Sequence, residues 1–377
     1  MLIQNVKIYI DRAFVNGSVR FGTLIEDCGE FISPKENEQY VDAHGGYLIP
    51  GLIDIHTHGA VRNDSSDGSA DGLEAMGRYY AAGGVTSWCP TTMTLSEDIL
   101  THAMTAIKNY TRAENGAKIA GVNLEGPFLS EAKKGAQAQE FLKSPDIEMF
   151  KRLNDASGGK IRLVTVAPEL DGAIDFIRQA SKICTVSLGH TAADYDISSR
   201  AFDAGASHVT HLFNAMNPIH HREPGLVCAA RDFGATAEII CDGVHVHPSA
   251  VRLAFDVFRE KMVIISDSLR CAGVLDESYS FVFGGQSVSV CGKKAVLTGT
   301  DTLAGSAVHL MDELRLAVKF GISLENAVYA VTEAPANVIG NKNIGKIKKG
   351  LAADMVLLDN DLNIKSIYID GREILCR

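Results

Sequence analysis

The middle of the chain alternates short apolar runs with amphipathic segments, and this alternation limits the possible folds more than any other feature. Strands buried on both faces by helices read as near-continuous apolar runs, as in parallel sheets. The segments 98–110 and 248–258 place apolar residues at helical spacing. The apolar runs that we interpret as strands are 52–56, 85–90, 119–124, 161–167, 184–188, 208–212, 237–241 and 262–266. Eight parallel strands with intervening helices predict an α/β fold, a (β/α)8 barrel of the TIM type.

Both ends of the chain have a different pattern, with short alternating runs typical of antiparallel strands. Near the N-terminus these runs are 6–10 and 18–25, with a turn expected at Asn16-Gly17. Near the C-terminus, 350–358 reads as a strand and 365–374 as a hairpin on an Asp-Gly turn. We therefore predict one small β-sandwich domain built from both ends, with the boundaries 1–50 for its first part, 51–346 for the barrel and 347–377 for its second part.

Composition excludes several classes of protein. The formal net charge of −10 argues against a nucleic-acid or anionic-membrane surface, because either would need a basic face. The eight cysteines are scattered without a Cys-x-x-Cys spacing, so neither a disulfide framework nor a zinc ribbon is indicated. The N-terminus has no signal-peptide pattern and no apolar run reaches membrane-spanning length. A cytoplasmic protein is expected.

Two histidines, His56 and His58, end the first predicted barrel strand. Alternate side chains of a strand lie on the same face, so the two rings should point the same way. Two neutral imidazoles placed side by side suit a divalent metal ion. Taken alone, the pair fits two exposed histidines near a turn at least as well as it fits a metal site. The residues that end the other predicted strands are therefore needed to distinguish the two interpretations.

Polar residues also follow four other predicted strands. Each of these residues could also have a purely structural role: Glu125 could cap a loop, His190 could be a buried histidine with hydrogen-bond partners, and Asp267 could cap a helix. However, the carboxyl ends of barrel strands meet at one rim, and a buried carboxylate is costly unless a cation neutralises it. Together these residues predict a metal site; they are His56, His58, Glu125, His190, His211 with Asn214, and Asp267.

Six motifs along the chain, taken in order, are more specific than any single residue. They are LEGPF (124–128), GHT (189–191), HLFNAM (211–216), REPG (222–225), DGVH (242–245) and LAGS (303–306). With them the sequence resembles the N-acetylglucosamine-6-phosphate deacetylase family of the amidohydrolase superfamily, over nearly its whole length. That family removes acetate from N-acetylglucosamine 6-phosphate and gives glucosamine 6-phosphate, in amino-sugar catabolism.

The resemblance implies a metal-dependent hydrolase in which Glu125, His190 and His211 hold the metal. Asp267 matches the family's general acid and base and would also contact the metal. His56 and His58 keep a pair that some members have lost, which favours two ions per chain over one. Nitrogen and oxygen donors accept zinc, iron, manganese or cobalt, with zinc or iron expected here.

The resemblance also implies the substrate contacts, for a phosphorylated N-acetyl amino sugar. Arg222 and His245 match phosphate-contacting positions, and a homodimer is expected, in which Arg222 would act either in its own subunit or across the dimer interface. Gln137 stands where some members have a histidine that polarises the amide carbonyl; it can donate a hydrogen bond but carries no charge. Further substrate contacts implied in the same way are Asn214 and Ala215, with Leu303, Ala304 and Gly305 around the acetyl group.

The chemistry agrees with this implication. Amide hydrolysis needs a nucleophile, a stabilised oxyanion and a proton for the leaving amine. A divalent metal lowers the pKa of bound water toward 7, and Asp267 would move the proton from that water to the amine nitrogen.

Three alternatives stay open at this point. A cyclic amidase with the same barrel bridges its metals with a modified lysine that ends strand four, but the segment 162–169 has no lysine. A non-catalytic scaffold of the same fold typically lacks ligands, whereas every ligand position here is filled. The third alternative is N-acetylgalactosamine 6-phosphate as the substrate, and no residue separates the two epimers.

Overall fold

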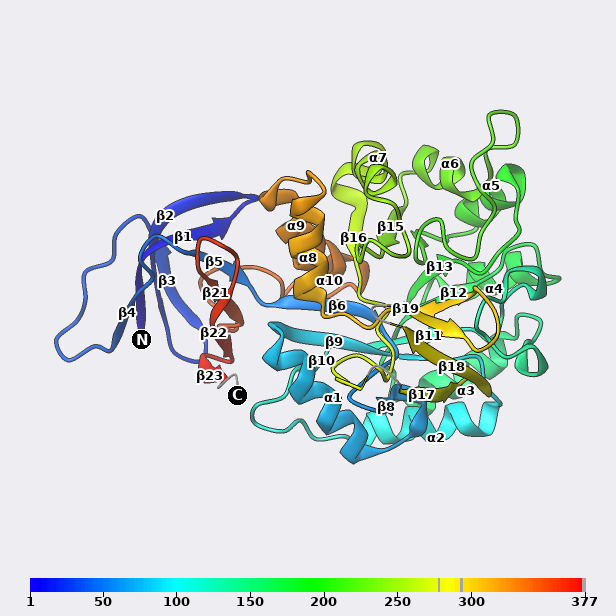
Figure 1. The fold of residues 1–377 in the computed structure, drawn as a ribbon, viewed down its shortest axis with the longest axis horizontal. Helices are drawn as coiled ribbons and strands as arrows, with labels where there is room; N and C mark the ends of the chain where they lie inside the picture. Colours follow the sequence, from blue (N-terminus) through cyan, green and yellow to red (C-terminus); the bar gives the residue numbers. More distant parts are fainter. Residues whose placement is uncertain (277–278, 292–293, 375–377) are drawn as a thin grey trace.

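The computed structural model describes residues 1–276, 279–291 and 294–374. It contains a barrel with surrounding helices and, at one end, a small sheet to which both chain ends contribute (Figure 1). The predicted (β/α)8 barrel with a small β domain from both chain ends is confirmed.

The barrel contains eight parallel strands in chain order around its wall. They are β6 (Leu52–Thr57), β9 (Val85–Thr92), β11 (Val122–Glu125), β12 (Ile161–Val166), β13 (Thr185–Leu188), β14 (His208–Val209), β15 (Thr236–Ile239) and β16 (Met262–Ile264). The first and last strands are joined just beyond β16, where Asp267 N donates to His56 O and His58 N donates to Ser268 O, both at 2.9 Å. This seam brings the ends of strands one and eight together at the rim.

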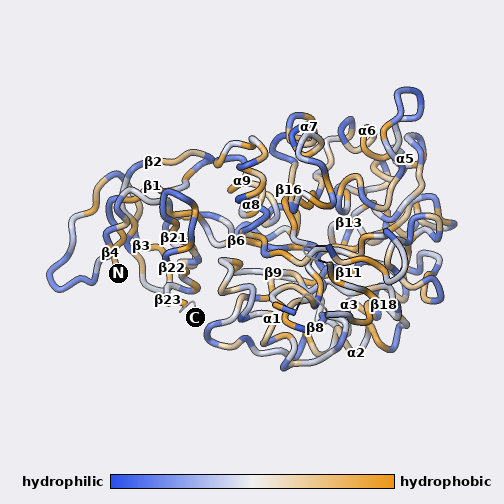
Figure 2. Tube along the Cα trace, viewed as in Figure 1, coloured by the Kyte–Doolittle hydropathy of each residue, from blue (hydrophilic) through white to orange (hydrophobic). Residues whose placement is uncertain are grey.

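Helices surround the barrel wall, and Figure 2 shows apolar strands inside with hydrophilic segments on outer helices and loops. Apolar side chains fill the barrel interior, among them Ile53, Ile55, Leu163 and Val263. No helix among the described residues is long and apolar enough to cross a membrane. The helices are α1 (Ala70–Ala82), α2 (Glu97–Asn109), α3 (Ile147–Ala156), α4 (Ala173–Ala180), α5 (Tyr195–Asp203), α6 (Gly225–Asp232), α7 (Pro248–Phe258), α8 (Leu310–Lys319), α9 (Leu324–Val331) and α10 (Glu333–Val338).

One predicted barrel strand, 119–124, is in fact two strands. β10 (Lys118–Ile119) pairs only with β9, and the chain then steps to β11, which pairs with both β9 and β12. The step passes through Gly121, where a Cβ atom would lie 2.3 Å from Arg162 Cγ. The side chain of Arg162 thus leaves no room for a side chain at position 121, where the chain moves from β10 to β11.

The small domain is one curled sheet. Its strand order is β23-β22-β21-β5-β1-β2-β3, with β4 beside β1. The rings of Phe21 on β2 and Tyr368 on β22 lie 5.0 Å apart, although four strand spacings of about 4.8 Å separate them along the sheet. The sheet thus folds over its own core. Its strands are β1 (Leu2–Ile10), β2 (Ala13–Phe21), β3 (Ile25–Gly29), β4 (Tyr40–Asp42), β5 (Tyr47–Pro50), β21 (Met355–Leu358), β22 (Ile364–Ile369) and β23 (Arg372–Ile374).

The turn expected at Asn16-Gly17 is wrong, because both residues lie inside β2. The chain reverses instead at Asp11 and Arg12, whose φ angles are +47° and +67°. Gly17 is needed for a different reason: a Cβ atom there would lie 2.2 Å from the carbonyl oxygen of Gly29 on the neighbouring strand.

An antiparallel sheet follows the last barrel strand, and the sequence did not lead us to expect it. It contains β17 (Ser280–Phe283), β18 (Gln286–Cys291), β19 (Lys294–Leu297) and β20 (Leu303–Gly305). Ser306, just after β20, accepts from Leu269 N through its backbone oxygen and donates from its own N to Asp267 O. This insertion therefore lies against the C-terminal end of the barrel.

A lysine joins the barrel to the small domain. Lys118 Nζ on β10 lies 2.9 Å from both carboxylate oxygens of Asp354, which is buried, and also pairs with Asp370. We predict that Lys118→Ala lowers the free energy of unfolding by about 3 kcal/mol, because it leaves a buried carboxylate unpaired. Denaturant unfolding would measure the change.

The matched control is Arg178→Ala, which breaks an exposed pair with Asp175. That substitution should change stability by less than about 0.5 kcal/mol. Equal effects from the two substitutions would show that the Lys118 link contributes no more than a surface pair.

Candidate metal centre and its cavity

A single buried carboxylate, Glu125, lies at the centre of the barrel rim. It ends β11, and the Nε2 atoms of four histidines surround it. Glu125 Oε1 lies 3.4 Å from His56, 3.3 Å from His190 and 3.2 Å from His211, and Oε2 lies 3.2 Å from His58. The structure therefore brings together the carboxylate and all four histidines that the sequence singled out.

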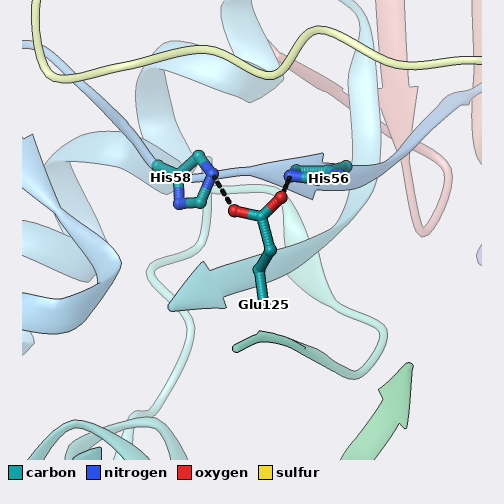
Figure 3. A group of neighbouring side chains, drawn as sticks. All are labelled: His56, His58 and Glu125. Atoms are coloured by element: carbon teal, nitrogen blue, oxygen red, sulfur yellow. Dashed lines mark ion pairs between the residues drawn. The ribbon is translucent and has the colours of Figure 1, made fainter. Parts of the chain in front are cut away.

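These residues form two groups that share Glu125. One is His56, His58 and Glu125, in which the two rings flank the carboxylate from β6 and the residues just after it (Figure 3). The other is Glu125, His190 and His211. In each group the possible ligand atoms lie within 4.8 Å of one another, so each could hold one ion.

The backbone directs several of these side chains into the mouth of the barrel. His190, His211 and Asp267 follow β13, β14 and β16, and their φ angles are +49°, +27° and +47°. Residues other than glycine adopt such angles at a cost of about 1–2 kcal/mol, because Cβ crowds the backbone. The strained angles turn each chain away from its strand direction at the position where the polar side chain is needed.

Hydrogen bonds fix the tautomers of two histidines. His56 Nδ1 lies 2.9 Å from Glu238 Oε2, and His190 Nδ1 lies 2.8 Å from the carbonyl oxygen of Lys133. Both partners only accept, so each Nδ1 carries the hydrogen, and neutral rings keep their lone pairs on Nε2, the atom nearest Glu125.

This arrangement fits a divalent metal ion. His56 Nε2 is fully buried with no hydrogen-bond partner, although it lies 3.4 Å from Glu125 and 3.5 Å from Asp267. A ring nitrogen that faces two carboxylates without a hydrogen-bond partner is what a metal cation would satisfy. Imidazole nitrogens and carboxylate oxygens are ligands for zinc, iron, manganese and cobalt.

The charges of the site agree with this fit. Burial would lower the pKa of His56, but Glu238, Glu125 and Asp267 outweigh it and raise that pKa well above its usual value. Against the same effect of burial, Asp267 and Glu125 raise the pKa of His58 to about 9. Burial raises the pKa of Glu125, but the histidines, His56 foremost, hold it well below its usual value. The protons on these rings thus balance the buried acids, and a metal would replace them.

A cavity of about 410 Å3 opens above Glu125. Besides His58, Glu125, His190, His211 and Asp267, the expected residues that line it are Gln137, Asn214, Ala215, His245, Leu303, Ala304 and Gly305. His56 lies beneath it, fully buried. Gln137 is already engaged with the site, since its Nε2 donates to Glu125 Oε2 at 2.7 Å.

Arg222 is the exception among the expected residues. It lies on an exposed loop before α6, outside the residues that line this cavity in the described part of the chain. Its Nη1 contacts the neighbouring His221 at 2.7 Å, and among the described residues it forms no ion pair with the adjacent Glu223. Within one chain, Arg222 is therefore not brought to the site.

Sequence reasoning missed two residues that support the site. Buried Glu238 accepts from His56, from His208 Nε2 at 3.1 Å and from the backbone N–H of His211 at 3.1 Å. A glutamate within the apolar run 237–241 was the signal that could have found it, because a charge in a buried strand needs partners. Asp242 Oδ2 similarly lies 2.7 Å from His245 Nδ1, which leaves His245 Nε2 free for a ligand.

Comparison with known families agrees with the fold and the site. The Amidohydrolase family profile matches residues 47–374. The chain belongs to the amidohydrolase family.

Within that family the similarity is to one group of enzymes. The chain is 38% identical to N-acetylglucosamine-6-phosphate deacetylase of Bacillus subtilis (strain 168) over 84% of this chain and 82% of the relative. It is 35% identical to N-acetylgalactosamine-6-phosphate deacetylase of Escherichia coli O157:H7, over 86% and 87%. A Mycobacterium smegmatis N-acetyl-D-glucosamine-6-phosphate deacetylase mutant in complex with N-acetyl-D-glucosamine-6-phosphate superposes with a TM-score of 0.93, 30% identity and coverage of 100% and 99%.

Because Glu238 orients His56, we predict that Glu238→Gln weakens metal binding by about 10- to 100-fold. Loss of a residue that hydrogen-bonds to a metal ligand typically has an effect of this size. Competition with a chromogenic chelator would measure the affinity of metal-stripped protein. The control Glu260→Gln removes an exposed carboxylate and should leave the affinity unchanged. Parent-like affinity in Glu238→Gln would mean that packing alone holds His56.

Proposed function

We propose that this protein hydrolyses the acetamide of N-acetylglucosamine 6-phosphate and releases glucosamine 6-phosphate and acetate. One observation carries the proposal: Glu125 and four histidines lie beside Asp267 at the floor of a cavity sized for a monosaccharide. The similarity to deacetylases of this class over most of the chain supports the same reading.

We infer two metal ions per chain, zinc or iron, that share Glu125. His56 and His58 would hold one, and His190 and His211 the other. Metal ions at this position would supply a Lewis acid for the amide carbonyl and a water nucleophile ionised near neutral pH.

Asp267 is the residue that moves the proton. Burial alone would raise its pKa, but His56 and His58 outweigh burial and lower it, so the group is ionised at neutral pH and ready to accept a proton. Its backbone N–H and C=O are both engaged, with His56 O and Ser306 N. The carboxylate is therefore held at the cavity floor, where it can take a proton from water and give it to the leaving amine.

The remaining cavity residues orient the sugar and its acetyl group. Asn214 and Gln137 offer amide hydrogen-bond donors, and Ala215 offers its backbone. Leu303, Ala304 and Gly305 on β20 would enclose the acetyl methyl group. Restricted space at this position favours acetamides over larger amides.

His245 would contact the phosphate from its own chain, and Arg222 would do so from the second subunit of a homodimer. Arg222 is exposed and lies away from its own cavity, as a residue that acts in a neighbouring site would. Exposed apolar side chains surround its loop, including Ile219 (48% exposed) and Leu253 (51%). They border an apolar hollow of about 210 Å3 between α6 and α7, a surface that a second subunit could cover.

We place the reaction in the cytoplasm. Six of the eight cysteines lie where the structure describes side chains, and all six are free thiols. Unpaired thiols are typical of a reducing compartment.

The second candidate is the epimeric substrate, N-acetylgalactosamine 6-phosphate, because a relative with that name is 35% identical to this chain. Acetate release from the two sugar phosphates, measured with metal supplied, tests both. We expect hydrolysis of N-acetylglucosamine 6-phosphate, about two ions per chain by metal analysis, and loss of at least about 10³ in kcat for Asp267→Asn and Glu125→Ala. A preference for the galacto epimer would select the second candidate. Turnover equal to that of the parent in both variants would overturn the assignment.

If Arg222 acts across a dimer, two variants that are each impaired at low substrate should complement each other. Arg222→Ala should raise KM for the phosphorylated sugar roughly 30-fold or more, since a buried charge-assisted contact is worth about 2 kcal/mol or more. When Arg222→Ala and Asp267→Asn subunits are mixed, half of the dimers are hybrids with one complete site. Turnover at low substrate should then recover to about a quarter of the parent value.

Mixtures with no recovery would place Arg222 in its own subunit or outside the site. Arg178→Ala, on an exposed helix, serves as the control and should change neither KM nor complementation.

A further inference from the structure

We propose that two segments far apart in the sequence, 130–137 and the hairpin tip 283–286, form a clamp that holds the metal ligands Glu125 and His190 in place. In this clamp Gln286 is a positioning residue that acts through Gln137. The inference rests on the proposed function only for its activity measurement.

The clamp begins with the side chain of Gln137, which is buried and held at both ends. Its Oε1 accepts from the backbone N–H of Thr94 at 2.8 Å, and its Nε2 donates to Glu125 Oε2 at 2.7 Å. Because the Thr94 N–H can only donate, the amide oxygen must face it and the amide nitrogen must face the carboxylate. Gln137 therefore sets the rotation of the carboxylate shared by both groups of ligands.

The same segment also holds His190. The carbonyl oxygen of Lys133 accepts from His190 Nδ1 at 2.8 Å, and Ser130 N donates to the carbonyl oxygen of His190 at 3.0 Å. His190 has a φ angle of +49°, so these two bonds oppose the relaxation of a strained residue. A shift of 130–137 would thus move a ligand of one group and rotate the carboxylate of both.

The hairpin between β17 and β18 fastens this segment. Gln286 Nε2 lies 2.7 Å from the carbonyl oxygen of Ala136 and 3.2 Å from that of Gln137. On the other strand of the hairpin, the ring of Phe283 meets His58 edge to face with centroids 5.3 Å apart. The tip thereby contacts both sides of the metal centre.

Gln286 does not line the cavity, whereas Phe283 and Gln137 do. A substrate in the cavity would meet Gln137 but not Gln286. An effect of Gln286 on the site would therefore pass through the segment that it holds or through Phe283 on the same hairpin, and not through a contact with the substrate.

Metal titration of stripped protein without substrate tests the clamp. Gln286→Glu keeps the size of the side chain but removes the donor, and Gln286→Ala removes the whole contact. We expect either change to raise the metal concentration for half-saturation about tenfold. This is the low end of the effect of losing a residue that hydrogen-bonds to a metal ligand. With metal saturating, kcat should fall more than KM rises, because the ligands rather than the sugar contacts are displaced.

Two controls separate positioning from general loss of structure. Ser287→Ala changes the neighbouring exposed residue of β18. Gln139→Ala removes a glutamine whose side chain, among the described residues, donates a hydrogen bond to exposed Glu131 and to no other side chain. Both should keep parent-like metal affinity. The melting temperature of the metal-free Gln286 variants should also match that of the parent.

A double-mutant cycle decides whether the effect passes through Gln137. If it does, the loss of metal affinity in Gln137→Ala with Gln286→Ala should be smaller than the two single losses combined, because the only part of the Gln286 effect that remains is the part passing through His190. Additive losses would overturn the clamp, and so would parent-like metal affinity in both Gln286 variants. A lower melting temperature of metal-free protein without a change in metal affinity would also overturn it. Because the titration uses no substrate, these outcomes can be read even if the protein does not deacetylate a sugar phosphate.

Discussion

The contact between Glu125 and the histidines around it is the interaction on which the rest of this structure depends. A carboxylate buried at the end of a barrel strand would be costly alone, since desolvation of an unpaired charge costs several kcal/mol. Four imidazoles from three parts of the rim surround it, His56 foremost among them lowers its pKa, and metal ions held by the same rings would supply the same compensation. The arrangement stabilises the barrel mouth only when positive charge is present, so binding chemistry and local stability depend on the same residues.

The surrounding fold leaves Glu125 and the histidines little freedom to move. Strands one and eight meet through the backbone of His56 and Asp267, which places the acid and the first histidine in register. Glu238 connects the side chain of His56 to the backbone of His211 from below. The rim is thus assembled from backbone hydrogen bonds and buried carboxylates, and it does not rely on flexible surface side chains.

Local features of the structure could be predicted from the sequence, but features that depend on contacts between distant residues could not. The failed predictions have physical reasons. Helix α7 begins and ends where the apolar periodicity placed it, because Pro248 begins the helix and its apolar face packs on the barrel. Gly17 was interpreted as a turn residue, yet its role is to let β2 approach β3. A glycine allows both, and only the partner strand distinguishes them. Gln286 carried no signal, because its partners are backbone carbonyls about 150 positions earlier.

The sequence alone determined the class of fold and most members of the site. Strand length, helical periodicity and the position of polar residues are local properties, and barrel strands necessarily bring their carboxyl ends to one rim. Only the tertiary structure decided which ring nitrogen faces Glu125, that Gln137 contacts this carboxylate, and that Arg222 lies away from the cavity of its own chain. These features depend on distances between residues far apart in the chain, which no local pattern encodes.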